Sequence, residues 1–203
     1  MIDAFLIAHP FVVVAVWAAL YTSDYYLTLW GARLYKETVS TYIDFDGSYE
    51  LEQVFKKDID ALRWISPEWV YQLGLSSSVL MFSWLLTVRI LEVPELFLVV
   101  VGAYVLLEAV VHTRHVSNVV LFRTLKTRGA VEGRIKYARW VTDRVSKAQV
   151  LAFALVFIVC FAISAKIIFL GGALGCLLNT LRLARQARRR RMTATSITPT
   201  PHS

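Results

Sequence analysis

Three residues whose side chains could do chemistry, Glu108, His112 and His115, are spaced four and three positions apart. These intervals put all three on one face of a helix. One carboxylate with two imidazoles suits a divalent metal such as zinc or iron, and the same groups can relay protons because histidine titrates near neutrality. We therefore predict a metal site or a proton path on this face, from a pattern less specific than the H-E-x-x-H motif.

Asp24 is the residue expected to join this face from another part of the chain. It lies about 20 residues into the first apolar segment, and His112 lies about 17 residues into the third, so both should reach one depth if these segments run parallel. The start of the second apolar segment should bring Glu68 and Gln72 to the same level. The expected polar intramembrane cluster consists of Asp24, Glu108, His112, Arg114 and His115.

An ordinary interfacial role would also explain these residues. Glu108 and Arg114 could be charges at the membrane surface, and the two histidines could contact lipid headgroups. Asp24 could pair with Arg114 only to neutralise a buried charge. Against this, ionisable groups at membrane depth are costly and by default mark a functional site. Both explanations stay open at the level of the sequence.

The composition indicates that lipid surrounds the elements that carry these residues. Hydrophobic residues make up 57% of the 203 residues, and the mean hydropathy is +0.54, whereas a soluble domain carries about 45–50% apolar residues. We predict an all-α polytopic transmembrane helix bundle, with residues 1–187 as one domain and residues 188–203 as a basic, disordered tail. The net charge of +7 lies beside apolar segments, so anionic lipid is the expected partner. No nucleic-acid motif accompanies it, and we expect no nucleic acid.

Four apolar segments are long enough to cross a bilayer. The expected spans are residues 5–30, 69–88, 95–122 and 148–181, and amphipathic patterns predict interfacial helices over residues 48–66 and 130–147. The last run of 34 residues would be about 51 Å long as a helix, too long for one crossing of about 30 Å and short for two. Four spans are the main prediction, and five spans with a turn at Lys166 are the alternative. Gly171 and Gly175 predict a helix-packing face.

The orientation depends on that span count. With four spans, the positive-inside rule favours an N-terminus outside the cell. The same assignment leaves the most concentrated positive charge of the chain, Arg188 to Arg191, outside as well. A fifth crossing would bring this basic cluster to the inner side.

The segment Asp24-Tyr-Tyr-Leu27-Thr28, followed by Tyr49-Glu50-Leu51, resembles uncharacterised small membrane families. In those families an Asp-x-x-Leu-Thr first span precedes a Glu-Leu-Asn-Pro turn, where this chain has Glu52-Gln53 instead of Asn-Pro. The resemblance covers less than a tenth of the chain. It implies a multi-span membrane protein and draws attention to Asp24, but it assigns no activity.

Three functions are compatible with these patterns. The leading prediction is a non-enzymatic accessory or assembly subunit of a membrane complex, or a homo-oligomer, in the cytoplasmic membrane, because no extramembrane domain and no established catalytic motif are apparent. The first alternative is a small proton or cation channel or transporter that uses a polar layer of Asp24 and His112. The second is a metal-dependent intramembrane hydrolase that uses Glu108, His112 and His115.

Overall fold

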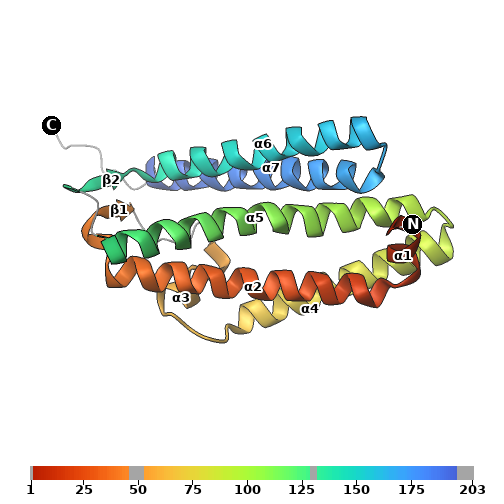
Figure 1. Ribbon diagram of the computed structural model, residues 1–203, viewed down its shortest axis with the longest axis horizontal. Helices are drawn as coiled ribbons and strands as arrows, with labels where there is room; N and C mark the ends of the chain where they lie inside the picture. Colours follow the sequence, from red (N-terminus) through yellow and green to blue (C-terminus); the bar gives the residue numbers. More distant parts are fainter. Residues whose placement is uncertain (1, 46–52, 129–131, 196–203) are drawn as a thin grey trace.

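The computed structural model describes residues 2–45, 53–128 and 132–195, and in these ranges it contains seven α-helices and two short strands (Figure 1). The helices are α1 (Ile2–Ala8), α2 (Pro10–Glu37), α3 (Gln53–Asp60), α4 (Pro67–Trp84), α5 (Pro94–Arg128), α6 (Arg139–Ser164) and α7 (Ile167–Thr195). The strands are β1 (Ile43–Phe45) and β2 (Ile135–Tyr137), a 3₁₀ turn covers Val39–Thr41, and a π-helical segment, Leu85–Ile90, extends α4. The all-α expectation is confirmed.

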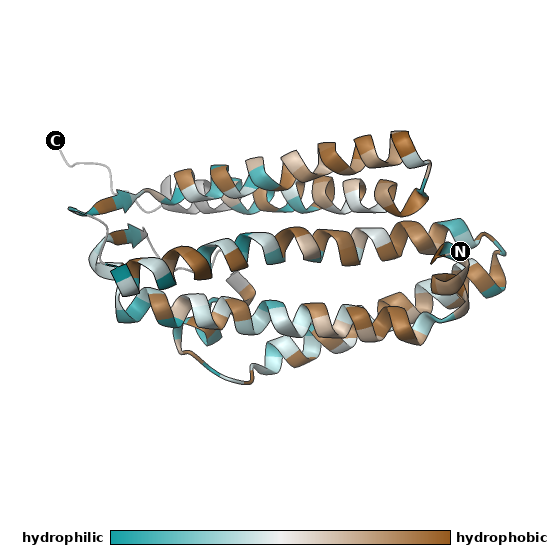
Figure 2. Cartoon of the chain, viewed as in Figure 1, coloured by the Kyte–Doolittle hydropathy of each residue, from teal (hydrophilic) through white to brown (hydrophobic). Residues whose placement is uncertain are grey.

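Five helices are long and apolar enough to cross a membrane. They are Pro10–Glu37, Pro67–Ile90, Pro94–Arg128, Arg139–Ser164 and Ile167–Arg188. Hydrophobic residues dominate the end of the bundle that holds α1 and the turn between α6 and α7, and hydrophilic residues gather at the end that holds β1 and β2 (Figure 2). We call these the apolar end and the polar end. The arrangement is compatible with an integral membrane protein.

The last apolar run, expected as one span over residues 148–181, forms two helices. α6 ends at Ser164 and α7 begins at Ile167, and Ala165 between them has a left-handed backbone with φ of 51°. The Lys166 backbone N–H donates to Ser164 Oγ at 3.3 Å, and Lys166 Nζ lies 2.7 Å from Asp3 Oδ2 of α1. One straight helix would be longer than a crossing, and folding back lets both halves pack against each other.

Glycines bring α7 into backbone contact with α5. A Cβ atom added to Gly171 would lie 2.1 Å from the carbonyl oxygen of Val99, and one added to Gly175 would lie 2.5 Å from an α5 carbonyl oxygen. The structure thus places the expected packing face of Gly171 and Gly175 against α5. Gly102 contributes from the α5 side, where an added Cβ would lie 1.9 Å from the carbonyl oxygen of Ile168.

At the apolar end, α2 and α5 enclose a closed hydrophobic core. Val13, Phe97 and Val101 are 2%, 1% and 2% exposed and pack together. Trp84 packs against them, and its indole Nε1 donates to the carbonyl oxygen of Ile7 at 2.8 Å. Because this core is closely packed, a cavity between α2 and α5 is expected only toward the polar end.

The segment expected as an interfacial helix over residues 130–147 contains two different elements. Residues 129–131 lie outside the described part of the chain, β2 occupies Ile135–Tyr137, and α6 begins at Arg139. β2 pairs in parallel with β1, and the Ile135 N–H donates to the Tyr42 carbonyl oxygen at 2.8 Å. Gly133, with φ of 86°, turns the backbone out of the helical path that the hydrophobic stripe suggested.

The other two expected features at the polar end also differ from the structure. Of the interfacial helix predicted over residues 48–66, residues 48–52 lie outside the described part, and α3 covers only Gln53–Asp60. Of the tail predicted to be disordered, residues 188–195 continue α7, and residues 196–203 lie outside the described part. Arginine and alanine favour helix, so a packed helix can continue into this basic segment.

Candidate functional site

Asp24 of α2 and Glu108 and His112 of α5 converge inside the bundle. One carboxylate oxygen from each acid and one imidazole nitrogen lie within 4.8 Å of one another, which is a spacing that could hold a metal ion. Glu108 and His112 are one helical turn apart on α5, and Asp24 faces them from the neighbouring helix α2. The structure therefore brings together residues that are 84 or more positions apart in the sequence.

Two hydrogen bonds fix the His112 ring. Its Nδ1 lies 3.0 Å from the Glu108 carbonyl oxygen, and because a carbonyl can only accept, Nδ1 carries a proton. Its Nε2 lies 2.7 Å from Ser23 Oγ. In neutral histidine this leaves Nε2 with the lone pair, which can bind a cation. The one hydrogen of the Ser23 hydroxyl also has the Leu20 carbonyl oxygen as an acceptor, at 2.9 Å. A ring oriented by an Nδ1–H bond to a backbone carbonyl is a common arrangement for metal-binding histidines.

His115 belongs to the cluster in a different role. Arg114 Nη2 lies 3.3 Å from His115 Nε2, and because a guanidinium can only donate, Nε2 accepts this bond. Thr28 Oγ1 lies 3.3 Å from the other ring nitrogen, Nδ1. Asp24 Oδ1 lies 3.5 Å from the same Nε2, and since that atom accepts from Arg114, it donates no hydrogen bond to Asp24. The three residues whose atoms lie close enough to hold a metal are Asp24, Glu108 and His112, whereas the sequence predicted Glu108, His112 and His115.

Each of the two acids has one buried oxygen atom without a hydrogen-bond partner, Asp24 Oδ1 and Glu108 Oε1. Glu108 is only 7% exposed. Two carboxylates this close in a low-dielectric interior repel each other unless a cation or a shared proton lies between them. Arg114 is close enough to attract both acids, but its guanidinium is bonded to Ser146 Oγ at 2.6 Å and to His115.

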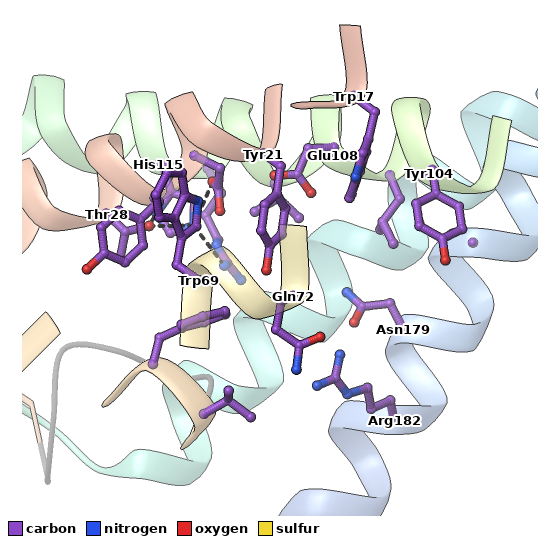
Figure 3. A pocket seen from close by; sticks show the side chains of 18 of the residues that line it. Trp17, Tyr21, Thr28, Trp69, Gln72, Tyr104, Glu108, His115, Asn179 and Arg182 are labelled. Atoms are coloured by element: carbon purple, nitrogen blue, oxygen red, sulfur yellow. Dashed lines mark hydrogen bonds and ion pairs between the residues drawn. The ribbon is translucent and has the colours of Figure 1, made fainter. Parts of the chain in front are cut away.

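A cavity of about 470 Å³ adjoins this cluster and is lined by residues of α2, α3, α4, α5 and α7. Glu108 and Tyr21 point into it from α5 and α2, and Gln72, Asn179 and Arg182 lie opposite (Figure 3). Aromatic side chains form much of the apolar wall. They include Trp17, Tyr21, Tyr25, Trp69 and Tyr104. Glu108, whose Oε1 lacks a hydrogen-bond partner, therefore lines a cavity that is large enough for a small ligand.

The helix α3 lies at this cavity and is fixed by a buried polar network. Asp58, 7% exposed, accepts hydrogen bonds from Ser66 Oγ and from Arg63 Nη1, the latter at 3.0 Å. Ser66 also caps α4, because its Oγ accepts from the Trp69 N–H at 3.2 Å. The Tyr25 hydroxyl of α2 donates to the Arg63 carbonyl oxygen at 2.7 Å. The network holds the turn between α3 and α4 against α2.

The helix α7 also contributes to the cavity, which was not predicted from the sequence. Asn179 and Arg182 line it together with Gly175. These three residues follow the same spacing of four and three positions as Glu108, His112 and His115, so one face of α7 could have been recognised in the same way. Of the two residues expected from the second span, Gln72 lines the cavity, and Glu68 accepts a hydrogen bond from Gln72 Nε2 at 2.8 Å.

Comparisons of this chain with protein-family models, curated proteins and solved structures gave no match. The resemblance of the Asp24 segment to uncharacterised membrane families therefore stays a prediction. Any function assigned to this protein has to be argued from the site itself.

Proposed function

We propose that this chain crosses the cytoplasmic membrane five times, with its N-terminus outside the cell. Five candidate helices support this count. With five crossings, every lysine and arginine except Arg89 and Lys166 lies in the half of the bundle toward the polar end. The positive-inside rule then puts that end in the cytoplasm, and Arg188 no longer conflicts with it.

We propose further that the protein binds a divalent metal ion through Asp24, Glu108 and His112, with zinc and iron as the candidates. The observation that carries this proposal is the pair of buried carboxylate oxygens that lack a hydrogen-bond partner within reach of an oriented imidazole. A cation would satisfy both oxygens and remove their repulsion. Two oxygens and one nitrogen suit borderline cations of this kind.

A metal-dependent enzyme is the function that this site supports best, with hydrolysis as the reaction. Three protein ligands leave a coordination position for water or substrate, which is the pattern of catalytic rather than structural zinc sites. The cavity beside Glu108 offers room for a substrate at that position. Asp24, Glu108 and His112 would hold the ion, and the ion would supply a coordinated water of lowered pKa as the nucleophile for hydrolysis.

The two other predicted functions have less support. A channel or transporter would need a path through the apolar end, where Val13, Phe97 and Val101 pack closely. An accessory or assembly subunit stays an untested prediction, and it would not require a cavity beside two buried acids. Self-association and other membrane subunits as partners also stay predictions.

Metal binding by purified protein tests the proposal. The protein is stripped with a chelator in mild detergent, and binding of zinc and of ferrous iron is then measured at equilibrium. We expect one ion per chain in the unmodified protein and at least tenfold weaker binding in Asp24→Asn, Glu108→Gln and His112→Gln, as for loss of a ligand. His9→Gln is the matched control, because His9 is exposed at the other end of the bundle. Equal affinity in all four variants, or no stoichiometric ion, would contradict the proposal.

A further inference from the structure

We propose that the cavity binds an amphiphile with a phosphate group, whose headgroup meets Arg182 and the metal site and whose chain lies along the aromatic wall. The inference deepens the proposed function by naming a ligand class, and it rests on that function for part of its charge balance.

The charged groups in the lining suit a phosphate. Arg114 and Arg182 both line the cavity, and a divalent ion would balance the carboxylates of Asp24 and Glu108. Arginine matches phosphate in both charge and geometry, because its N–H groups form parallel hydrogen bonds to phosphate oxygens. Asn179, one turn before Arg182 on the same helix face, adds an amide donor.

The rest of the lining favours an apolar tail on the same ligand. Trp17 and Tyr104 meet edge to face with ring centroids 4.9 Å apart, and Trp17 stacks on Tyr21 at 5.3 Å. Trp69 stacks on Tyr25 at 5.4 Å on the other side of the cavity. These rings offer far more apolar surface than a small hydrophilic phosphate compound could use.

The position of the cavity agrees with a ligand that comes from the membrane. Its acidic residues, Asp24 and Glu108, lie about three turns nearer the polar end than Val13 and Phe97 of the closed core. A lipid headgroup that enters from the polar end would therefore meet them before it reached that core. α4 packs on α2, and α7 packs on α5 and α6, so α4 and α7 flank the cavity from two sides. A chain could leave between these two helices while the phosphate stays near Arg182.

Three probes separate the possible sources of the phosphate. Metal-loaded protein in uncharged detergent is titrated calorimetrically with dioctanoyl phosphatidic acid, with dioctanoylglycerol and with inorganic phosphate. We expect the phosphatidic acid to bind about tenfold or more tightly than either fragment, because only it uses both the arginines and the aromatic wall. Equal binding of dioctanoylglycerol would overturn the phosphate part of the inference, and equal binding of inorganic phosphate would overturn the amphiphile part.

Two arginines of α7 provide a matched pair of variants. Arg182→Gln should weaken binding of the phosphatidic acid about tenfold, because a charged hydrogen-bond partner is lost. Arg185→Gln should leave it unchanged, since Arg185 is exposed one turn further along and is not among the cavity residues. The same effect in both variants would indicate general attraction by the basic helix and would overturn the inference.

The metal and lipid titrations fail independently. Stoichiometric metal binding without a preference for phosphatidic acid would overturn this inference and leave the proposed function standing. A preference for phosphatidic acid that depends on Arg182, in a protein that binds no metal, would overturn the proposed function and retain the ligand class.

Discussion

The two ends of the α2–α5 pair use the same helix faces for opposite purposes. Val13 and Phe97 meet in the closed core of the apolar end. Eleven residues further along each helix, about three turns, Asp24 and Glu108 meet in the polar cluster. The core of the apolar end is closely packed. At the polar cluster, two carboxylate oxygens lack hydrogen-bond partners and a cavity adjoins them. The difference confines the cavity to the polar end, where the proposed site would give up stability for binding.

The largest effect is expected from filling the closest helix contact. Gly102→Ala would put a Cβ atom 1.9 Å from the Ile168 carbonyl oxygen, so α5 and α7 would have to separate. We expect the free energy of unfolding to fall by about 3 kcal/mol, the upper part of the range for overpacking. Gly74→Ala is the control, because nothing lies within 4 Å of its added Cβ. Thermal unfolding in detergent measures both, and equal stability of the two variants would refute the close packing.

The next effect concerns the core of the apolar end. Phe97→Ala would leave a void where a side chain is 1% exposed, and we expect a loss of about 2 kcal/mol in the free energy of unfolding. This is below the loss of about 3–5 kcal/mol in soluble cores, because lipid is itself apolar and mainly packing is lost. Phe82→Ala, at a side chain 64% exposed, should cost much less in the same denaturation experiment. A reversed order would contradict a closed apolar end.

A smaller, local effect is expected at the edge of the cavity. Asp58→Ala removes the hydrogen-bond acceptor for Ser66 and Arg63. We therefore expect the free energy of local opening of α3 to fall by about 1–2 kcal/mol. Faster amide hydrogen exchange in α3, with unchanged exchange in α5, would reveal this. Lys57→Ala should leave the exchange unchanged because Lys57 is exposed on the same helix. Uniform acceleration across all helices would mean that the network supports the whole bundle.

The smallest effect has the opposite sign and distinguishes the two ends. In metal-free protein, Glu108→Gln removes either the repulsion between two neighbouring carboxylates or the cost of protonating one of them, so we expect a gain of about 1 kcal/mol in the free energy of unfolding. The same variant should lose the stabilisation that added zinc gives the unmodified protein. Glu95→Gln, exposed at the start of α5, should change neither quantity. If metal-free Glu108→Gln were instead less stable than the unmodified protein, the Glu108 carboxylate would stabilise the fold, which would contradict this prediction.

The proximity of Asp24 to Glu108 and His112 could be predicted from the sequence, since helical periodicity and span lengths determine which residues share a face and a depth. Their role as a site stays a prediction. The exchange of His115 for Asp24 in the donor set could not be predicted, because it depends on how Arg114 and Thr28 orient one ring. The turn at Ala165 was also uncertain, since no glycine or proline marks it and the left-handed residue is held by surrounding contacts. Local patterns do not encode such tertiary interactions.

X-ray absorption at the metal edge tests the central claim most directly, because it counts the imidazole ligands of the bound ion. The spectrum of zinc-loaded protein is compared with that of zinc-loaded His115→Gln. Ligation by Asp24, Glu108 and His112 predicts one imidazole with oxygen ligands in both proteins. Two imidazoles in the unmodified protein that fall to one in His115→Gln, or a shell of oxygen ligands alone, would contradict this assignment.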